Sequence, residues 1–536
     1  MIDTSGFDKR NLWTLPGGEL CVRPSFQKYQ LSTGNTGATP IDIDSEDLTT
    51  TKRNTCVSAF SIKDNFTGQV QHYIITYDTA LPTLAADSDR SSTSSHKGVK
   101  ITVYDEEFQP LQMLMVPASR RPRAVTLGRV GRNGEMIISS PDFATVWGYV
   151  GGGIKIAQRV ASVNEATPAM HIPQGICLGW NGRVVIASGE VLFFSDVFAP
   201  RTYASNGTIG MPGIIYGLHL APGGSLAVVT SNGTYALAAD TTGGQGGDQA
   251  VIGVLDKVSE YSAYEYGKTV MTKTGLWGLT TNGMMNLDRG TEIRLADKKI
   301  TRRLDECIDM RDFRECRMLS WSHGPIVAMG HTQLSGYQSD FATTTASHTS
   351  YGAMNKNERA MYVYDEVDGF GSWWTSNVDG GNFMLAGVLT ESDGRDLIVS
   401  PTAIYNPYGN LEDGDETDGT GGDIPVGILA GRMDTPAEMS PVVRRITTSS
   451  DNGGKDQQVS LRGDTAKVKE TTANGPVIGT DVWGTSKKYT TRELTSRRFT
   501  FGKRTDDVTI EIGVEGSYSR IGLADVVTGG QGSRRP

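Results

Sequence analysis

The sequence contains few of the residues that carry most metal and thiol chemistry. It has five cysteines, an odd number at wide spacings, and only seven histidines among 536 residues. This cysteine pattern excludes a disulfide framework and predicts reduced thiols. No run of about 18 apolar residues occurs, so no membrane-spanning helix or membrane insertion is expected. The polar first ten residues lack the apolar core of a secretory signal, so we expect folding in a cytoplasm.

Common nucleotide and hydrolase motifs are missing as well. Gly-rich runs at 151–153 and 243–247 lack the Lys-Ser/Thr that completes a phosphate loop, and no Gly-x-Ser-x-Gly elbow is present. The acidic run that starts at Asp413 has Ile424 where a calcium loop requires Glu. We therefore predict no nucleotide, calcium or other cofactor.

Four residues have side chains that bind zinc, but their spacing does not fit a zinc site. They are spread too evenly and too widely along the chain, unlike the closely spaced ligand pairs of compact zinc sites. Packing explains these residues better, and the sequence predicts no metal. The four are Cys307, Cys316, His323 and His331.

Glycine, in contrast, is abundant, with 65 residues, and it marks a repeat. Turn glycines at Gly189, Gly233 and Gly275 are almost evenly spaced, and each lies between two short apolar segments. Hairpins that recur at intervals of about 40 to 45 residues are typical of the blades of a β-propeller. The segments 184–186 and 191–194 are apolar on both faces, as strands between two neighbouring blades must be. A two-layer β-sandwich with the same hairpins is the alternative.

We predict an all-β chain in three parts. Residues 1–50 form an N-terminal arm and loop, 51–434 a propeller core with inserted loops at 332–357 and 410–423, and 435–536 an additional C-terminal β domain. One helix is expected at 297–308, where Ile300, Leu304 and Ile308 share a face. Residues 441–536 carry 16 basic and 11 acidic side chains, while the rest of the chain has a net charge of −14.

Two sets of residues are candidates for glycan chemistry. Propeller glycosidases require paired carboxylates. The stretch from Asp365 to Trp373 is the nearest match to a sialidase-type box, although the leading Ser is missing, and its candidate carboxylates are Asp365, Glu366 and Asp368. Tryptophans can stack on sugar rings, but a Trp that follows Gly in a blade more often packs between sheets. The tryptophans in question are Trp277, Trp373 and Trp374.

Several segments resemble the tail hub, or nozzle, proteins of short-tailed bacteriophages, a family that includes packaged-DNA stabilisation proteins. The segment 176–195, ICLGWNGRVVIASGEVLFFS, looks like a typical stretch of that family. Three further segments resemble segments of that family in type and in order along the chain. They are the arm 18–26, the helix at 298–308, and the strand 362–365 followed by Trp373-Trp374. The loops at 332–357 and 410–423 and the longer C-terminal part depart from the family pattern.

The resemblance implies a structural virion protein that is not an enzyme. Such a protein forms a ring, usually a homohexamer, that extends the tail channel, retains packaged DNA and lets it pass at ejection without sequence-specific binding. The implied partners are further copies of the chain, the portal adaptor or head–tail connector, and tail fibre, tailspike or needle proteins. In such a protein, the C-terminal β domain, residues 435–536 here, makes the ring and adaptor contacts. The implied location is the virion tail, after assembly in the host cytoplasm.

The acidic loop is the one surface to which we assign a place in that ring. We expect it to face the lumen or an end of the tube, because like charge keeps DNA from sticking. Its carboxylates are Glu412, Asp413, Asp415, Glu416 and Asp418. A propeller glycan hydrolase or a module that binds host polysaccharide is the alternative function.

Overall fold

The computed structural model describes most of the chain in short strands. The described residues are 8–14, 19–29, 55–64, 67–81, 96–118, 120–130, 134–157, 172–239, 252–280, 283–287, 317–331, 359–366, 369–375, 385–400, 403–409, 412–413, 422–423, 427–433, 442–451, 457–463, 466–473, 495–504, 508–514 and 520–529. The expected helix at 297–308 and the loop at 332–357 lie outside them. The chain divides into two compact units, and each is described by itself.

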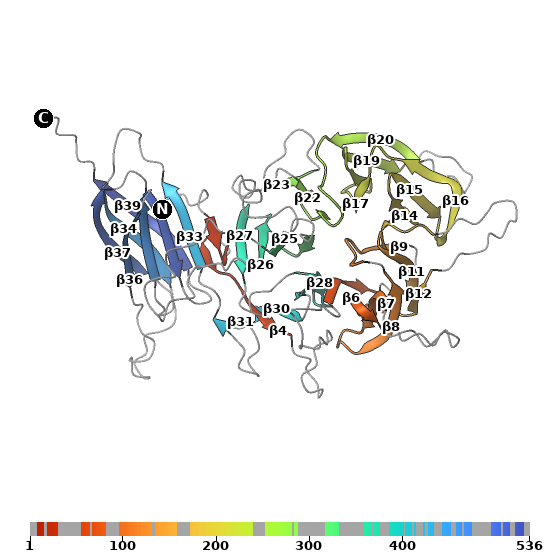
Figure 1. The fold of residues 1–536 in the computed structure, drawn as a ribbon, viewed down its shortest axis with the longest axis horizontal. Helices are drawn as coiled ribbons and strands as arrows, with labels where there is room; N and C mark the ends of the chain where they lie inside the picture. The colour runs from red at the N-terminus through yellow and green to blue at the C-terminus, as the bar shows by residue number, and fades with distance from the viewer. Residues whose placement is uncertain are drawn as a thin grey trace. The chain divides into compact units, whose positions relative to one another are not determined.

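Unit 2, residues 29–330 and 384–405, contains seven groups of antiparallel strands in its described part, and the first and last groups are joined into one sheet by the parallel pairing of Ala59 with Gly387. We number them as blades 1 to 7 in chain order (Figure 1). The strands are, in blade 1, β5 (Thr55–Lys63), β6 (Val70–Leu81), β7 (His96–Tyr104) and β8 (Pro110–Pro117); in blade 2, β9 (Thr126–Val130), β10 (Glu135–Ser140), β11 (Phe143–Tyr149) and β12 (Gly153–Ile156); in blade 3, β13 (Ile176–Trp180), β14 (Arg183–Ser188), β15 (Val191–Asp196) and β16 (Ala199–Gly210); in blade 4, β17 (Ile215–Leu220), β18 (Leu226–Thr230), β19 (Gly233–Ala239) and β20 (Ile252–Ser259); in blade 5, β21 (Thr269–Met271), β22 (Leu276–Thr280) and β23 (Gly283–Asn286); in blade 6, β24 (Arg317–Trp321) and β25 (Gly324–His331); and in blade 7, β28 (Gly387–Thr390), β29 (Asp396–Val399) and β30, which starts at Ile404.

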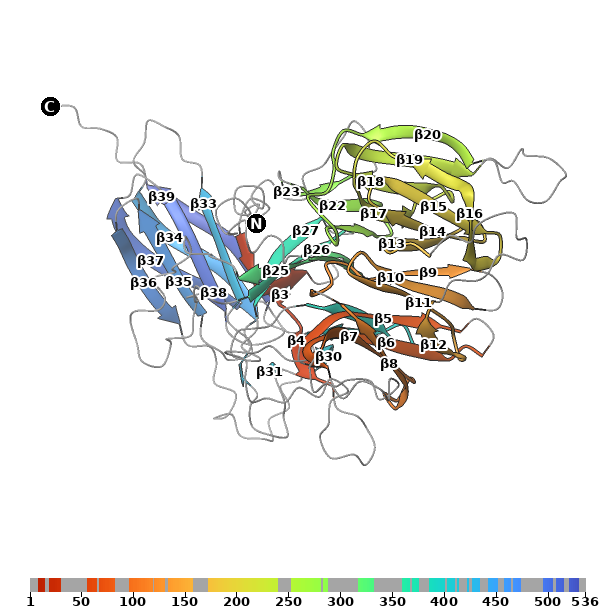
Figure 2. The same ribbon diagram turned by 45° about the vertical axis from the view of Figure 1, so that its right-hand side comes forward.

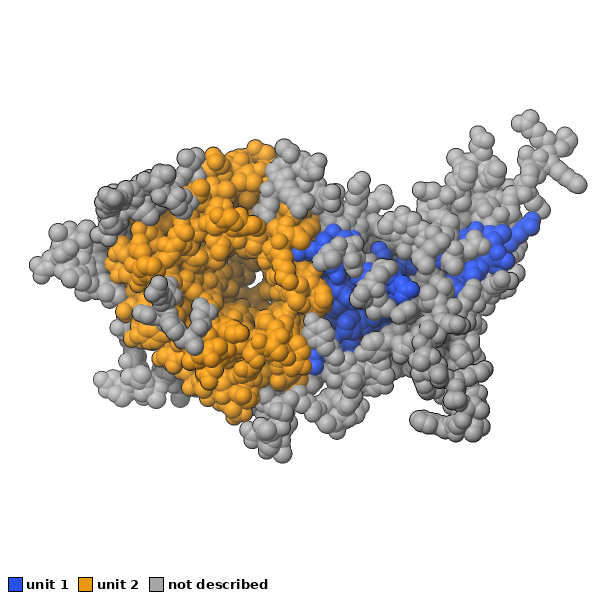
Figure 3. Space-filling model, turned by 180° about the vertical axis from the view of Figure 1, so that it is seen from behind, with its two compact units in different colours: residues 1–28, 331–383, 406–536 blue, residues 29–330, 384–405 orange. Residues whose placement is uncertain are grey.

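The first strand of each blade contacts the first strand of the next, so these strands form an inner ring. The contacts run from β9 to β13, β17, β21, β24, β28 and finally β5. The ring closes between blades 1 and 2, where the Arg129 Nη2 of β9 donates to the Lys63 carbonyl of β5 at 3.2 Å. Unit 2 is therefore a β-propeller of seven blades within its described residues, and Figure 3 shows it as a ring hollowed at the centre.

Hydrogen bonds between neighbouring blades fix this closure. The Cys177 N–H of blade 3 donates to the Thr126 hydroxyl of blade 2 at 2.7 Å, and the Trp180 indole donates to the Gly224 carbonyl of blade 4 at 2.8 Å. On the other side of the ring, the Thr390 N–H of blade 7 donates to the Ser61 hydroxyl of blade 1 at 2.9 Å. The first two bonds are partly buried, so each satisfies a polar group where the sheets stack, whereas the third is exposed.

The apolar repeat in the sequence has its explanation in this stacking. Val184 and Ile186 of β14 pack in a core with Trp147 of blade 2, whereas Val185 packs with Leu226 of blade 4 in another core. Both faces of the strand are buried, because a blade lies on each side of it. The hairpins predicted around Gly189, Gly233 and Gly275 are confirmed, and all three glycines have positive φ.

Unit 1, residues 1–28, 331–383 and 406–536, is also all-β. One sheet has the order β26-β27-β1-β33-β38-β35-β36 within this unit, and another has the order β2-β3-β39-β34-β37 (Figure 2). The strands described are β1 (Asp8–Arg10), β2 (Leu12–Thr14), β3 (Leu20–Val22), β4 (Ser25–Lys28), β26 (Arg359–Asp365), β27 (Phe370–Thr375), β31 (Glu412–Asp413), β32 (Gly422–Asp423), β33 (Gly427–Met433), β34 (Val442–Asp451), β35 (Gln457–Gly463), β36 (Ala466–Ala473), β37 (Thr495–Arg504), β38 (Val508–Val514) and β39 (Arg520–Gly529).

Unit 1 is built from distant parts of the chain. Leu20 of β3 pairs with Ile521 of β39, and Arg10 of β1 pairs with Trp373 of β27. The N-terminal strands thus belong to the same unit as the C-terminal β domain, and the propeller is an insertion between segments of that unit. The division expected from the sequence placed the N-terminal strands in an arm of their own, apart from the C-terminal domain.

Candidate functional site

The tryptophans that could stack on sugars are buried. Trp277 and Trp373 are 5% exposed and Trp374 is fully buried. The Trp374 indole donates to the Leu12 carbonyl at 3.2 Å and lies 5.8 Å from the Phe26 ring. These three rings are core side chains of their units, which counts against a glycan platform built from them.

The carboxylates suggested by the sialidase-type box do not form a pair in the described structure. Asp365 is buried at the end of β26, where it pairs with Phe370 across the hairpin, and Glu366 follows it in a turn. Both belong to unit 1, and Asp368 lies outside the described residues. In the acidic loop, Glu412 and Asp413 form the short strand β31, which pairs with β32, whereas Asp415, Glu416 and Asp418 lie outside the described residues.

The thiols and imidazoles in the described chain are packing groups. Cys21, Cys56 and Cys177 are buried free thiols, and burial raises the pKa of Cys56 and Cys177 to about 12. His323 packs against Trp321, with ring centres 5.0 Å apart, whereas Cys307 and Cys316 are not described. No group of three metal-binding side chains occurs among the described residues. That part of the chain also contains no helix with the length and hydropathy needed to cross a bilayer.

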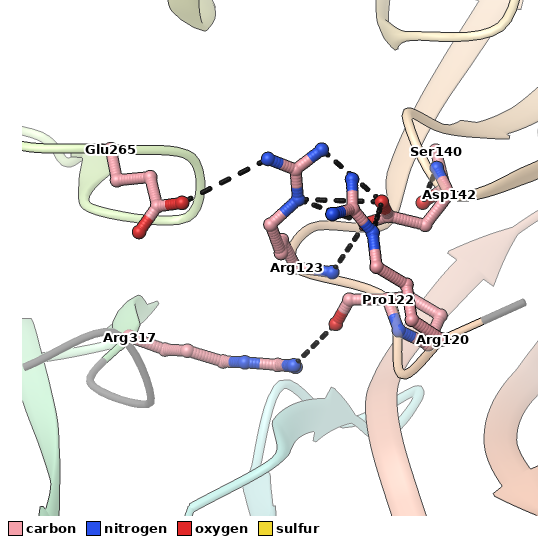
Figure 4. Close-up of polar contacts among 7 residues, drawn as sticks. All are labelled: Arg120, Pro122, Arg123, Ser140, Asp142, Glu265 and Arg317. Carbon is pink, nitrogen blue, oxygen red and sulfur yellow. Dashed lines mark hydrogen bonds and ion pairs between the residues drawn. The ribbon is translucent and has the colours of Figure 1, made fainter. Parts of the chain in front are cut away.

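The main polar cluster lies at one end of the propeller channel. It is formed by residues at or just before the start of inner strands, and by the β10–β11 turn beside the start of β9. Because the inner strands run in the same direction, these residues meet at the same end of the channel, which we call the mouth. The cluster contains Arg120, Arg123, Asp142, Glu265 and Arg317 (Figure 4).

Asp142 is the centre of the mouth cluster, and its side chain has no exposed surface. It accepts hydrogen bonds from the Arg120 Nε at 2.6 Å, the Arg123 backbone N–H at 2.8 Å and the Arg123 Nη2 at 3.2 Å. Burial alone raises the pKa of this carboxyl, but the hydrogen bonds from Arg123 and Arg120 outweigh it and lower the pKa. Asp142 is therefore an ionised acceptor that holds two arginines in place.

Arg123 extends from blade 2 to the opposite side of the ring. Its Nη1 lies 3.8 Å from the Glu265 carboxylate, and its guanidinium covers the Tyr266 ring at 4.8 Å, both just before blade 5. The approach is close at Gly267, where a Cβ would lie 3.0 Å from the Arg123 carbonyl and φ is +73°. Glycine is required there, because this φ strains other residues and the space is occupied.

Arg317, at the start of blade 6, supports the same connection. Its Nη2 donates to the Pro122 carbonyl at 2.9 Å, and its Nη1 contacts the Val57 carbonyl of blade 1. The segment between blades 1 and 2 thus contacts blades 5 and 6, which are not its neighbours in the ring. Among the described residues, the mouth contains four arginines (Arg120, Arg121, Arg123 and Arg317) and two carboxylates, so this part of it is locally cationic in a chain of net charge −9.

The sequence alone did not reveal this cluster. The local signal was the run Arg120-Arg121-Pro122-Arg123, but its carboxylate partners, Asp142 and Glu265, stand far along the chain from it. Chemically, the mouth can hold an anion on its guanidinium groups. It is poorly suited to acid–base catalysis on a glycoside, since that chemistry uses two available carboxylates and Asp142 is bound by two arginines.

A second feature is a groove of about 560 Å³ between blades 1 and 2. Two glutamines bridge its walls: the Gln112 amide bonds the Ile154 backbone in both directions, at 2.6 and 2.7 Å, and the Gln71 Oε1 accepts from the Gly151 N–H at 3.2 Å. Tyr73 and Tyr149 also line it. The groove combines aromatic, amide and glycine backbone surface.

The fold and the mouth define a β-propeller protein with an attached β unit. Comparison with protein-family models finds no match, and comparison with curated proteins finds none either. Among solved structures, Raptor from Chaetomium thermophilum is similar with a TM-score of 0.36 and 13% identity over 66% of this chain and 29% of that chain. This chain thus spans under a third of that protein's length.

Two glycan-active proteins show weaker likeness. A glycoside hydrolase family 43 arabinoxylan arabinofuranohydrolase from Bacillus subtilis matches with a TM-score of 0.20 and 8% identity, over 91% of this chain and 100% of that one. The Trypanosoma rangeli sialidase matches with a TM-score of 0.24 and 9% identity, over 96% of each chain. The function of the present chain must therefore be argued from its own residues.

Proposed function

We propose that this chain is a non-catalytic structural subunit of a ring in the virion, of the tail hub kind that its sequence resembles. In this role it extends the tail channel, retains packaged DNA and lets it pass at ejection. The observation that carries the proposal is the engagement of Asp142 by Arg120 and Arg123 at the propeller mouth. A carboxylate fixed in this way serves to hold the structure together rather than to transfer protons.

The chain topology gives further support. The propeller is inserted into a β unit that contains strands from both ends of the chain. A ring needs heterologous contacts, in which two different patches of one subunit meet, and two units in one chain offer different surfaces for them. We infer that the partners are copies of this chain in a homohexamer, an adaptor on one side, and tail fibre, tailspike or needle proteins on the other.

Electron microscopy and mass measurement of the purified chain test the proposal. We expect rings with a mass of six times the 57.7 kDa chain, or recruitment into rings when the adaptor is supplied. Particles from the parent virus should contain the chain at the tail. A monomer at all concentrations that is also absent from virions would refute the proposal.

Glycan binding or hydrolysis is the second candidate, and the groove between blades 1 and 2 favours it. Tyr149 is 37% exposed there, beside the amides of Gln71 and Gln112, and sugars bind to such mixtures of aromatic and amide groups. Calorimetric titration with cellotetraose and a reducing-sugar assay test this candidate. If it is correct, Tyr149→Ala abolishes binding, whereas Phe198→Ala, at a residue 65% exposed outside the groove, leaves it unchanged.

A further inference from the structure

The mouth of the propeller presents cationic groups that the chain itself only partly engages. Arg120 bonds Asp142 through its Nε at 2.6 Å, and 57% of its side chain is exposed. Its Nη1 and Nη2 atoms make no other hydrogen bond or ion pair within the described residues. A planar guanidinium with outward donors suits carboxylates, which it binds with two parallel hydrogen bonds.

The chain also contains a segment of matching charge. Residues 412–423 include six carboxylates and no basic residue. The ends of this segment are held together by the pairing of β31 with β32, in which Glu412 faces Asp423 and Asp413 faces Gly422.

We propose that the arginines at the propeller mouth bind the acidic segment 412–423 of a second copy of this chain. The inference rests on the proposed ring. It assigns the segment to a contact between copies and not to the lumen or the end of the tube, where the sequence analysis expects it. The mouth and the segment are two different patches of one subunit, which is the arrangement that a heterologous, head-to-tail contact requires. Several exposed charge pairs carry the contact, so salt weakens it.

Charge reversal tests this contact. One variant, Arg120→Glu, reverses a charge at the mouth. Another variant reverses the charge of the acidic segment and combines Asp413→Lys, Asp415→Lys and Glu416→Lys. Each alone should raise the concentration for half-maximal assembly about tenfold or more, since like charges then meet. Mixing the two variants should restore assembly, because the reversed mouth of one copy then meets the reversed segment of the other.

Arg395→Glu is the matched control for the mouth variant. Arg395 is also 57% exposed and also bound to carboxylates, those of Asp393 and Glu391, but it lies in the β28–β29 turn. The inner strand β28 ends at this turn, so Arg395 lies at the end of the channel opposite the mouth. This variant should assemble like the wild-type chain. Arg120→Gln is a milder mouth variant that keeps Arg123 on Asp142, and its thermal midpoint separates weak assembly from poor folding.

The outcomes distinguish this inference from the function on which it rests. If the wild-type chain forms no ring, the proposed function fails and the contact fails with it. If the wild-type chain forms rings and both reversed variants do so equally well, the contact is wrong and the proposed function stands. If each reversal weakens assembly but mixing does not restore it, the segment does not bind the mouth of another copy, and the inference is overturned.

Discussion

Arg123 and Glu265 lie 3.8 Å apart, Nη1 to Oε1, although one lies just before blade 2 and the other just before blade 5 of the propeller. Blades that are not neighbours in the ring meet through this pair and through the Arg317 bond to Pro122. Because the pair depends on the position of Arg123, it depends in turn on Asp142, which binds the same guanidinium. The mouth therefore responds as a unit when one of these groups is changed.

Asp142→Asn should destabilise the propeller by about 1–3 kcal/mol, discounted for the partial exposure of both arginines. The pKa of Asp142 is lowered, so folding favours the ionised form. Its stabilisation is complete above the ordinary carboxyl pKa of about 4 and is lost as the pH falls through the lower pKa of the folded state. Urea unfolding between pH 2 and 7 measures this loss, which the Asn variant should not show.

Asp393→Asn is the control for that experiment. Asp393 also binds an arginine, Arg395, and its pKa is lowered by hydrogen bonds from Arg395, but its side chain is 50% exposed. This variant should unfold at the same urea concentration as the wild-type chain at pH 7. An equal loss of stability in both variants would show that burial of Asp142 has no special importance.

His72 should make the propeller sensitive to mild acid. The imidazole is fully buried, stacks on Phe108 and bonds Ser61, and burial lowers its pKa to about 4. An unfolded histidine takes up its proton near pH 6.5, so the unfolded state binds more protons between pH 6.5 and 4. Stability falls as the pH falls through this window, by on the order of 2–3 kcal/mol from this residue. In His72→Gln the slope of stability against pH should decrease; an unchanged slope contradicts the assignment.

The turn glycines should differ in their tolerance of a side chain. Gly233 has φ +134°, and a Cβ there would lie 2.6 Å from the Ser259 carbonyl. Gly189 has φ +61° and open space around it. Gly189→Ala should therefore cost about 1–2 kcal/mol from the left-handed backbone alone, and Gly233→Ala should cost more. Thermal unfolding ranks the two, and the reverse order would disprove the packing around Gly233.

The buried thiols should resist alkylation. The thiolate is the reactive form, and burial raises the pKa of Cys56 and Cys177 to about 12. Iodoacetamide at pH 8 followed by mass spectrometry should leave both unmodified in the folded chain and label both in urea. Rapid labelling of either without denaturant would mean that its blade opens.

The sequence predicted the features that depend on near neighbours. The hairpin from Arg183 to Asp196 could be predicted, because its turn glycine and its apolar strands lie in one short stretch of the chain. The pairing of Leu20 with Ile521 could not, since the two strands stand near opposite ends of the chain and β3 is short. The mouth cluster could not be predicted for the same reason. Glu265 lies far from Arg123 in the sequence, and only the closed ring places the two side chains together.

The pairing of β3 with β39 also has a consequence for synthesis. Strand β39, the partner of β3, begins at Arg520. During synthesis, blades 1 to 5 are therefore complete long before β3 can pair with β39. On the ribosome, the propeller strands can pair with each other before the partner of β3 has been synthesised. Unit 1 therefore cannot be completed until residues near 520 have been made, long after the strands of the propeller.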